Sequence, residues 1–306
     1  MDIIVTYNVH HEMAFGVLIA FYFYLTGLSA GSFVISVIAT MFGRTDFKPL
    51  GKIGAVLAPA LLILAPVNLI VDLEQPARFW HLFVYTNFSS AMTWGTFLLT
   101  IYPMECLVYA YFVFKGNSKW SKRMGMIGIP LAISVHGYTG FILALGKARV
   151  LWNTPMMPIL FLISAMVSGI ALVIVIGAIR HWFFMKKTDP AKKLLDRNVL
   201  ITLGKMMAGF IILDLFLVFS DALVMTRHTE DAFAVVNLIR FGPTYFAILF
   251  LGVEVFLGGL LPVALIFFPK TGRSLPVLAI VSLFVLAGVF AMRYVLVVGG
   301  QFIPMS

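Results

Sequence analysis

The stretch PMMPILFLISAMVSGIALVIVIGAIR, residues 155–180, decides the fold class of this 306-residue chain. Its first charged residue is Arg180, whereas a helix needs only about 20 apolar residues to cross the hydrocarbon core of a bilayer. The whole sequence is 61% hydrophobic and 11% charged, far from the roughly 25% charged residues of soluble domains. The sequence therefore predicts an integral membrane protein.

Seven further apolar runs accompany this one. The predicted spans lie near 13–41, 51–71, 91–114, 124–146, 155–180, 200–222, 244–268 and 276–299. These runs are continuously apolar rather than alternating, which excludes a membrane β-barrel and favours helices. We expect one all-α membrane domain over residues 1–306 with eight transmembrane helices. Because the loops leave no room for a separate soluble domain, any large aqueous chemistry is expected on a partner.

Basic residues are divided unevenly between the two sets of connections. One side holds sixteen of the 22 lysines and arginines, and the other side, counted with Arg293, holds six. The positive-inside rule places the richer side in the cytoplasm, so both termini are expected outside, in the periplasm. The net charge of +9 is then a topological signal. The lipid bilayer is the expected partner of these charges, and nucleic acid is not.

Cysteine and histidine are too sparse for a metal centre. Cys106 is the single cysteine, which excludes an iron–sulfur cluster held by thiolates of this protein. A b-type haem needs paired histidines at matching depth on facing helices, and of the six histidines only His136 lies clearly inside a predicted span. We therefore expect no haem, no iron–sulfur cluster and no metal site here.

Two connections on the side poor in basic residues combine ionisable and aromatic residues. The first reads DLEQPARFWHLF from Asp72 and contains Glu74 and Arg78, and the second follows the span that holds His136 and Tyr138. Ionisable groups at such depth are costly unless they are paired or functional. A phenol and a carboxylate could bind a ligand at the outer membrane face. An interfacial belt of aromatic residues with a Glu74–Arg78 ion pair is the structural alternative.

Four segments resemble a known family. They are GLSAG at 27–31, DLEQPARF at 72–79, YTGFILALGKARVLWNTPMMPILFLISAMVSG at 138–169 and FAMRYVLVVGGQFIP at 290–304. In this order and spacing the sequence resembles the polysulfide reductase membrane-subunit family, also called NrfD-like, from about residue 13 onward. The resemblance implies two four-helix bundles side by side, in the cytoplasmic (inner) membrane of a bacterium or archaeon.

The resemblance also implies a function. Such a subunit exchanges electrons between membrane quinone, here expected to be menaquinone, and a ferredoxin-like iron–sulfur partner wired to a catalytic, molybdopterin subunit on the periplasmic side. Glu74 and Tyr138 match the family's acid and tyrosine, and Arg78 matches its arginine. We expect Glu74 and Tyr138 to be the catalytic pair that binds the quinone headgroup and exchanges its protons. Asp72, Arg78 and His136 are expected in the same site.

The first helix departs from the family. Some members have polar side chains, including histidine, on this helix, whereas this sequence has Ile19 and Tyr22 at the corresponding positions. His11 is therefore included among the expected quinone-binding residues, with His10 as its alternative.

Further ionisable residues lie within the predicted spans, namely Glu105, Asp214, Asp221, Glu254 and Arg293. Asp214 and Asp221 are seven residues apart and so lie on nearly the same helix face. Counting along the spans places Glu105 toward the cytoplasm and Asp221 toward the outside, with Asp214 and Glu254 between, and Arg293 could neutralise one acid of the sixth span. The set predicts either a proton pathway or charge pairs that hold the helices together.

Two other classes of function stay open. A secondary transporter or ion channel would have helices interrupted near the middle of the membrane, and Pro59, Pro66 and Pro262 are candidate interruptions. A passive anchor that only tethers a redox partner would need no acids at depth. Bound quinone would separate both alternatives from the quinone-reactive subunit.

Overall fold

The computed structural model describes residues 15–41, 47–73, 75–184, 190–228, 230–241 and 245–301. These residues form helices and turns, with no β-strand among them. Their membrane-length segments are α1 (Val17–Met41), α2 (Lys48–Val71), α4 (Ala91–Lys115), α5 (Ser118–Ala144), α6 (Met157–Phe183), α7 (Pro190–His228), the run of α9 (Tyr245–Ala247), η3 (Ile248–Leu260) and α10 (Leu261–Phe267), and α11 (Leu275–Val297). The predicted all-α membrane fold with eight spans is confirmed.

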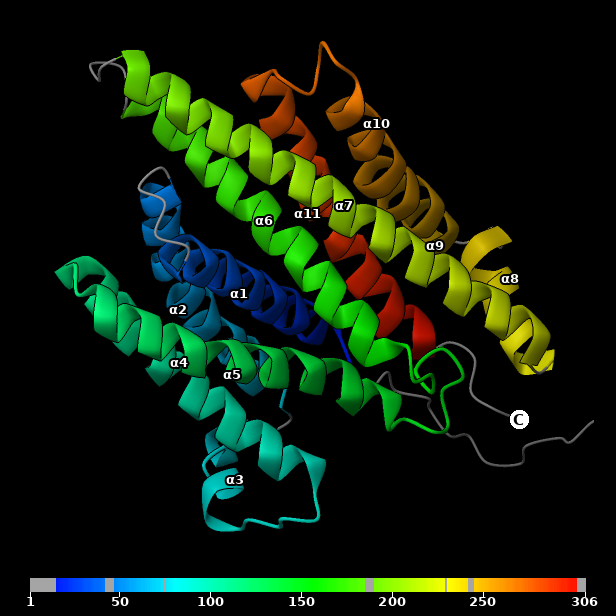
Figure 1. Ribbon diagram of the computed structural model, residues 1–306. Helices are drawn as coiled ribbons and strands as arrows, with labels where there is room; N and C mark the ends of the chain where they lie inside the picture. Colours follow the sequence, from blue (N-terminus) through cyan, green and yellow to red (C-terminus); the bar gives the residue numbers. More distant parts are fainter. Residues whose placement is uncertain are drawn as a thin grey trace, which may run out of the picture.

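The helices alternate in direction, so their connections gather at two ends (Figure 1). One end, the Trp152 end, holds the α5–α6 connection with Trp152 and the short elements η2 (Pro76–Arg78), α3 (His81–Val84), α8 (Glu230–Phe241) and η4 (Gly299–Gln301). The other, the Arg180 end, holds the α4–α5 and α10–α11 connections, the end of α6 and the start of α7.

Helix α1 lies at the centre and packs against α2, α5, α6 and α11. It approaches α6 closely, and a Cβ atom on Gly31 or on Gly169 would overlap the backbone of the facing helix. Small residues let helices in lipid approach to backbone contact, and the gain is van der Waals packing over a long crossing. The GLSAG and SAMVSG segments therefore fix how the first spans pack on the later ones.

The expected proline interruptions are not seen. Helix α2 runs continuously through Pro59 and Pro66, and Pro262 lies at the start of α10, which follows η3 without a break in helical backbone. Neighbouring helices can compensate the backbone hydrogen bond that a proline removes in a membrane. The interrupted helices predicted for a transporter are therefore absent at these three positions.

Capping sets helix ends that hydrophobicity does not show. The fourth span was expected from about residue 124, but α5 begins at Ser118 because the Asn117 side chain accepts a hydrogen bond from the Trp120 amide at 3.2 Å. Gly116, with φ of 73°, ends α4 in the left-handed conformation, which glycine adopts without strain. The polar first turn of α5 therefore belongs to the helix although it precedes the apolar run.

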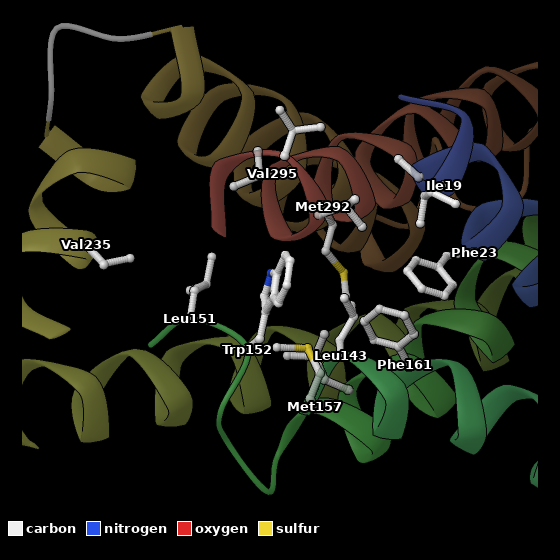
Figure 2. Packing of buried hydrophobic residues seen from close by; sticks show 14 of the residues in the cluster. Ile19, Phe23, Leu143, Leu151, Trp152, Met157, Phe161, Val235, Met292 and Val295 are labelled. Carbon is white, nitrogen blue, oxygen red and sulfur yellow. The ribbon is translucent and has the colours of Figure 1, made fainter. Parts of the chain in front are cut away.

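A buried cluster at the Trp152 end joins α1, the α5–α6 connection, α6 and α11. Figure 2 shows its side chains, among them Phe23, Phe161 and Met292, pointing toward one another around Trp152. The Trp152 indole donates a hydrogen bond to the Leu296 carbonyl at 2.6 Å. This packing fixes the α5–α6 connection to the end of α11, and so fixes the backbone around the candidate site.

Candidate functional site

Hydrogen bonds at the Trp152 end join three distant parts of the sequence. The Gln301 side chain accepts from the Phe15 amide at 3.0 Å and donates to the Phe15 carbonyl at 2.8 Å. Arg149 donates to the Gln301 carbonyl at 2.5 Å. Phe15, which is two residues before α1, the α5–α6 connection and η4 are therefore joined in one frame.

Asp72 lies beside this frame. It follows the last turn of α2, and its Oδ1 is 3.5 Å from where a Cβ on Gly16, next to the first residue of α1, would lie. The amino-terminal end of a helix carries partial positive charge, which suits a carboxylate. Desolvation by burial nevertheless raises the pKa of the Asp72 carboxyl above its ordinary value. The structure thus places this predicted residue near the start of α1.

Tyr138 lies on α5 and is half-buried. Its phenol packs directly on Gly95 of α4, where a Cβ atom would overlap the ring. Tyr22 of α1 lies within electrostatic range of it. No hydrogen bond joins the Tyr138 hydroxyl to another described residue, so this phenol is available to an external partner.

The other predicted residues of this group are less informative. Arg78 is exposed in η2 and makes no ion pair with a described residue. Glu74, His10 and His11 lie outside the described residues. The Glu74–Tyr138 pair, the Glu74–Arg78 ion pair and the role of His11 therefore stay predictions.

His136 lies apart from this group, in the centre of the protein. It is fully buried, and its Nε2 is 2.8 Å from the Phe161 carbonyl oxygen of α6. A Cβ on Gly27 of α1 would contact its ring at 3.0 Å. Residues two apart on a helix do not share a face, so His136 points toward α1 and α6 while Tyr138 packs on α4. The structure does not bring the two side chains together.

Arg293 of α11 is buried next to His136. Its guanidinium donates to the Ser164 hydroxyl at 2.5 Å and to the Phe161 carbonyl at 3.2 Å, and it lies over the Phe161 ring at 3.6 Å. Its Nε and Nη1 atoms have no hydrogen-bond partner among the described residues. The expected neutralisation by an acid of the sixth span takes a weaker form, because Asp214 acts on Arg293 electrostatically without an ion-pair contact between described atoms.

Three of the predicted acids line two neighbouring cavities. Asp214 and Glu254 line a cavity of about 10 Å³ between α7, η3 and α11, which is close to the space that one water molecule needs. Glu254 also lines a cavity of about 60 Å³ nearer the Trp152 end, together with Asp221. Asp221 accepts a hydrogen bond from Thr154 at 2.8 Å. The order Asp221, Glu254, Asp214 therefore leads inward from the Trp152 end toward Arg293.

Glu105 does not belong to this row. It lies on α4 and packs against Gly128 of α5, where a Cβ would come within 2.5 Å of its Oε2 atom. Both carboxylate oxygens are buried and have no hydrogen-bond partner among the described residues. The five predicted residues thus fall into two separate interiors.

Sequence reasoning missed Gln301 and Ser164. Gln301 holds the frame and Ser164 holds Arg293, but both lie in segments read mainly as apolar. The signal that could have found Gln301 was available, because it directly follows the apolar run of the last span, in the FAMRYVLVVGGQFIP segment. A polar amide at that point needs partners when it is buried.

No group of three or more histidine, cysteine or acidic residues that could hold a metal ion is found within the described ranges. The residues described above offer hydrogen bonding by a phenol, proton exchange by carboxyl groups, and charge compensation by Arg293.

Comparison with known proteins gives a consistent result. The family model described as "Polysulphide reductase, NrfD" matches residues 6–304. The C subunit of selenate reductase from Mesobacillus selenatarsenatis is 30% identical over 95% of this protein and 75% of its own length. The Hdr-like menaquinol oxidoreductase integral membrane subunit of Archaeoglobus fulgidus is 27% identical over 92% of this protein and 69% of its own length.

A further relative, the C subunit of polysulfide reductase from Wolinella succinogenes, is 34% identical over 56% of this protein and 59% of its own length. The match of the family model covers nearly the whole sequence, including the frame around Gln301 and every predicted site residue. With its eight apolar helices, the chain is an integral, multi-pass membrane protein that belongs to the polysulphide reductase NrfD family.

Proposed function

We propose that this chain is the quinone-reactive membrane subunit of a respiratory oxidoreductase complex. The observation that carries the proposal is the half-buried Tyr138 hydroxyl, which has no hydrogen-bond partner among the described residues and lies in a matched segment of the family. A relative is named as a menaquinol oxidoreductase subunit, which supports quinone, and menaquinone in particular, as the ligand. A half-buried phenol without a partner within the described ranges can donate a hydrogen bond to a ligand that accepts one.

The architecture and topology complete the proposal. We assign the protein as one membrane domain of two four-helix bundles, since α1, α2, α4 and α5 pack on one another, as do α6, α7, η3 and α11. The uneven distribution of basic residues supports a periplasmic Trp152 end and termini, in the inner membrane of a bacterium or archaeon. The quinone site then lies near the periplasmic face.

Partners are proposed from the relatives' names and from the small number of cysteine and histidine residues in this sequence. Relatives are named as subunits of selenate, polysulfide and tetrathionate reductases. We propose a ferredoxin-like iron–sulfur subunit and a catalytic, molybdopterin subunit at the periplasmic end. This protein then supplies the quinone site, and its partners supply the metal centres.

Each residue has a separate role in the proposed quinone site. Quinone supplies two-electron redox chemistry that is coupled to two protons. Tyr138 donates a hydrogen bond from its hydroxyl, and Glu74 holds or releases a proton at its carboxylate. Asp72, whose pKa is raised by burial, is a second carboxyl group for proton exchange. Arg78 provides positive charge to the site, and Tyr22 of α1 lies within electrostatic range of the phenol.

Quinol turnover in the assembled complex tests the assignment. Tyr138→Phe and Glu74→Gln should each lower turnover by about 10²-fold or more, which is the usual contribution of a positioned proton-transfer group. Tyr111→Phe is the matched control, because Tyr111 is an exposed tyrosine of α4. Unchanged turnover in both site variants would remove the two residues from the site, whatever the control shows.

A proton pathway is the second part of the proposal, and the two cavities that share Glu254 support it. Protons would pass between the carboxyl groups of Asp221, Glu254 and Asp214. Complex reconstituted in liposomes with a pH-sensitive dye should show proton movement beyond that of the quinone itself. Glu254→Gln should abolish the excess while Glu105→Gln keeps it. If wild type shows no excess, the acids only hold the helices together.

A further inference from the structure

A large cavity lies at the Arg180 end, far from the candidate quinone site. Its volume is about 380 Å³, and it opens between the end of α6, the start of α7 and the α10–α11 connection. Its lining residues are His181, Trp182, Arg197, Lys270, Arg273, Ser274, Leu275 and Pro276. Three cations and a histidine face one space, and no acidic residue of the described ranges lines it.

Asp196, the acidic residue next to Arg197 in the sequence, already has ionic partners. Asp196 forms an ion pair with Arg180, and its Oδ2 is 3.0 Å from Nδ1 of His181. His181 is 6% exposed, and its other ring nitrogen, Nε2, makes no hydrogen bond with a described residue. Asp196 thus fixes a buried imidazole in the wall of the cavity while its own charge is compensated by Arg180.

The cations of the cavity have no acidic partner among the described residues. Arg197 donates a hydrogen bond to the Arg273 carbonyl at 2.7 Å, which ties α7 to the α10–α11 connection. The side chains of Lys270 and Arg273 are exposed and make no ion pair within the described ranges. Among the described residues, positive charge therefore accumulates here without carboxylates that form ion pairs with these cations.

Backbone amides add hydrogen-bond donors that carry partial positive charge. Helix α11 begins at Leu275 against the cavity, and the Ser274 side chain makes no capping hydrogen bond. The amides of Leu275 and Val277 in its first turn have no intrahelical acceptors and carry partial positive charge, whereas Pro276 has no amide hydrogen. Together with guanidinium groups they form the donor set that phosphate oxygens prefer.

The surroundings of the cavity are those of a membrane surface. Exposed aromatic side chains flank it on two elements, namely Trp182, Phe183 and Phe184 at the end of α6 and Phe267 and Phe268 at the end of α10. Aromatic belts of this kind lie at the level of lipid headgroups. A phosphate held in the cavity could therefore be attached to acyl chains that lie along these rings.

We infer that this cavity binds a phosphate group, and that the group belongs to the headgroup of an anionic phospholipid. Basic pockets between membrane helices on the cytoplasmic side bind such headgroups. Arg197, Lys270 and Arg273 contact the phosphate oxygens, His181 approaches them from the buried wall, and the aromatic residues contact the acyl chains. The site lies at the opposite end of the molecule from Tyr138, and it does not depend on the proposed quinone chemistry.

Native mass spectrometry of the detergent-purified complex tests this site with phosphatidylglycerol and phosphatidylcholine as probes. Wild type should retain phosphatidylglycerol in preference to phosphatidylcholine. The double variant Lys270→Gln/Arg273→Gln should weaken phosphatidylglycerol binding by about thirtyfold, the effect expected for two cations near an anionic headgroup. Lys119→Gln/Arg123→Gln is the matched control, since it removes one exposed lysine and one exposed arginine at the same end, outside the cavity.

The outcomes are distinct. A loss confined to Lys270→Gln/Arg273→Gln, unaffected by millimolar inorganic phosphate, supports the lipid site. Competition by inorganic phosphate with the same dependence on the variants supports the phosphate site and assigns it to a soluble anion. Equal retention of both lipids by wild type, or equal losses in the two double variants, overturns the inference. Thermal unfolding in lipid-free detergent should be the same for all three proteins, because neither Lys270 nor Arg273 has a side-chain hydrogen bond within the described ranges.

Discussion

The described helices enclose acids in an interior around Glu254 and in another around Glu105, and of these two only the first contains a buried cation, Arg293. The Arg293 interior comprises Asp214, Glu254 and Arg293, and a small cavity lies beside them. The Glu105 interior contains Glu105, whose two buried carboxylate oxygens have no hydrogen-bond partner among the described residues. In lipid an isolated charge is far costlier than a compensated one. The comparison teaches that the Arg293 interior can hold negative charge, whereas the Glu105 interior favours a neutral side chain.

Removal of the Arg293 charge should change the free energy of unfolding more than any other substitution in the two interiors. Arg293→Leu leaves Asp214 and Glu254 without compensation and should lower the free energy of unfolding by about 3–5 kcal/mol. Glu105→Gln, which removes an acid that has no counter-charge, should change it by less than about 1 kcal/mol. Unfolding by a denaturing detergent measures both. Equal stability of Arg293→Leu and wild type would mean that the two interiors do not differ in the way described.

A smaller effect on the free energy of unfolding is expected when a glycine beside each interior is replaced by alanine. Gly288 of α11 faces Gly258 of η3 so closely that a Cβ would come within 2.6 Å of the facing Cα atom. Gly288→Ala should therefore separate two backbones and cost about 1–3 kcal/mol. Gly128→Ala meets the ends of the Phe33 and Glu105 side chains instead, which can move, so it should cost less. The same unfolding measurement ranks the pair, and the reverse order would contradict the packing argument.

The smallest predicted effect concerns pH and the Trp152 end. Because burial raises the pKa of Asp72 in the folded protein, the folded state binds its proton more tightly than the unfolded state. Stability contributed by this group should be present below about pH 4 and decline as pH rises through the raised pKa. The change should stay below about 1 kcal/mol because the side chain is only partly buried. Asp72→Asn should remove it, and an identical pH dependence in the variant would exclude Asp72 as its source.

The fold was predictable because each span carries its own signal. A continuous apolar run such as residues 155–180 needs no knowledge of its neighbours, so the number and type of the spans followed from hydrophobicity. The starts of the helices did not follow from hydrophobicity. The Asn117 cap that begins α5 is a local hydrogen bond beside a polar turn. The effect of Pro59 and Pro66 was predicted wrongly, because compensation by packed neighbours is invisible in one helix alone.

The candidate site was predictable only in part, because its geometry depends on contacts between distant segments. Tyr138 and His136 are two residues apart in sequence, yet they face different helices. Arg293 was expected opposite an acid, but a carbonyl and a hydroxyl of α6 lie closer to it. Helix rotation about its own axis decides such choices, and the weak periodicity of a mostly apolar span does not specify that rotation.

The paired hydrogen bonds between Phe15 and Gln301 also bear on biosynthesis. The two residues are separated by 286 positions, so the first helix enters the membrane long before its partner has been translated. Until then the start of α1 lacks its hydrogen bonds to Gln301. A polypeptide released early would lack them permanently. Any quality control that recognises this end could distinguish a finished subunit from an unfinished one before partner subunits assemble on it.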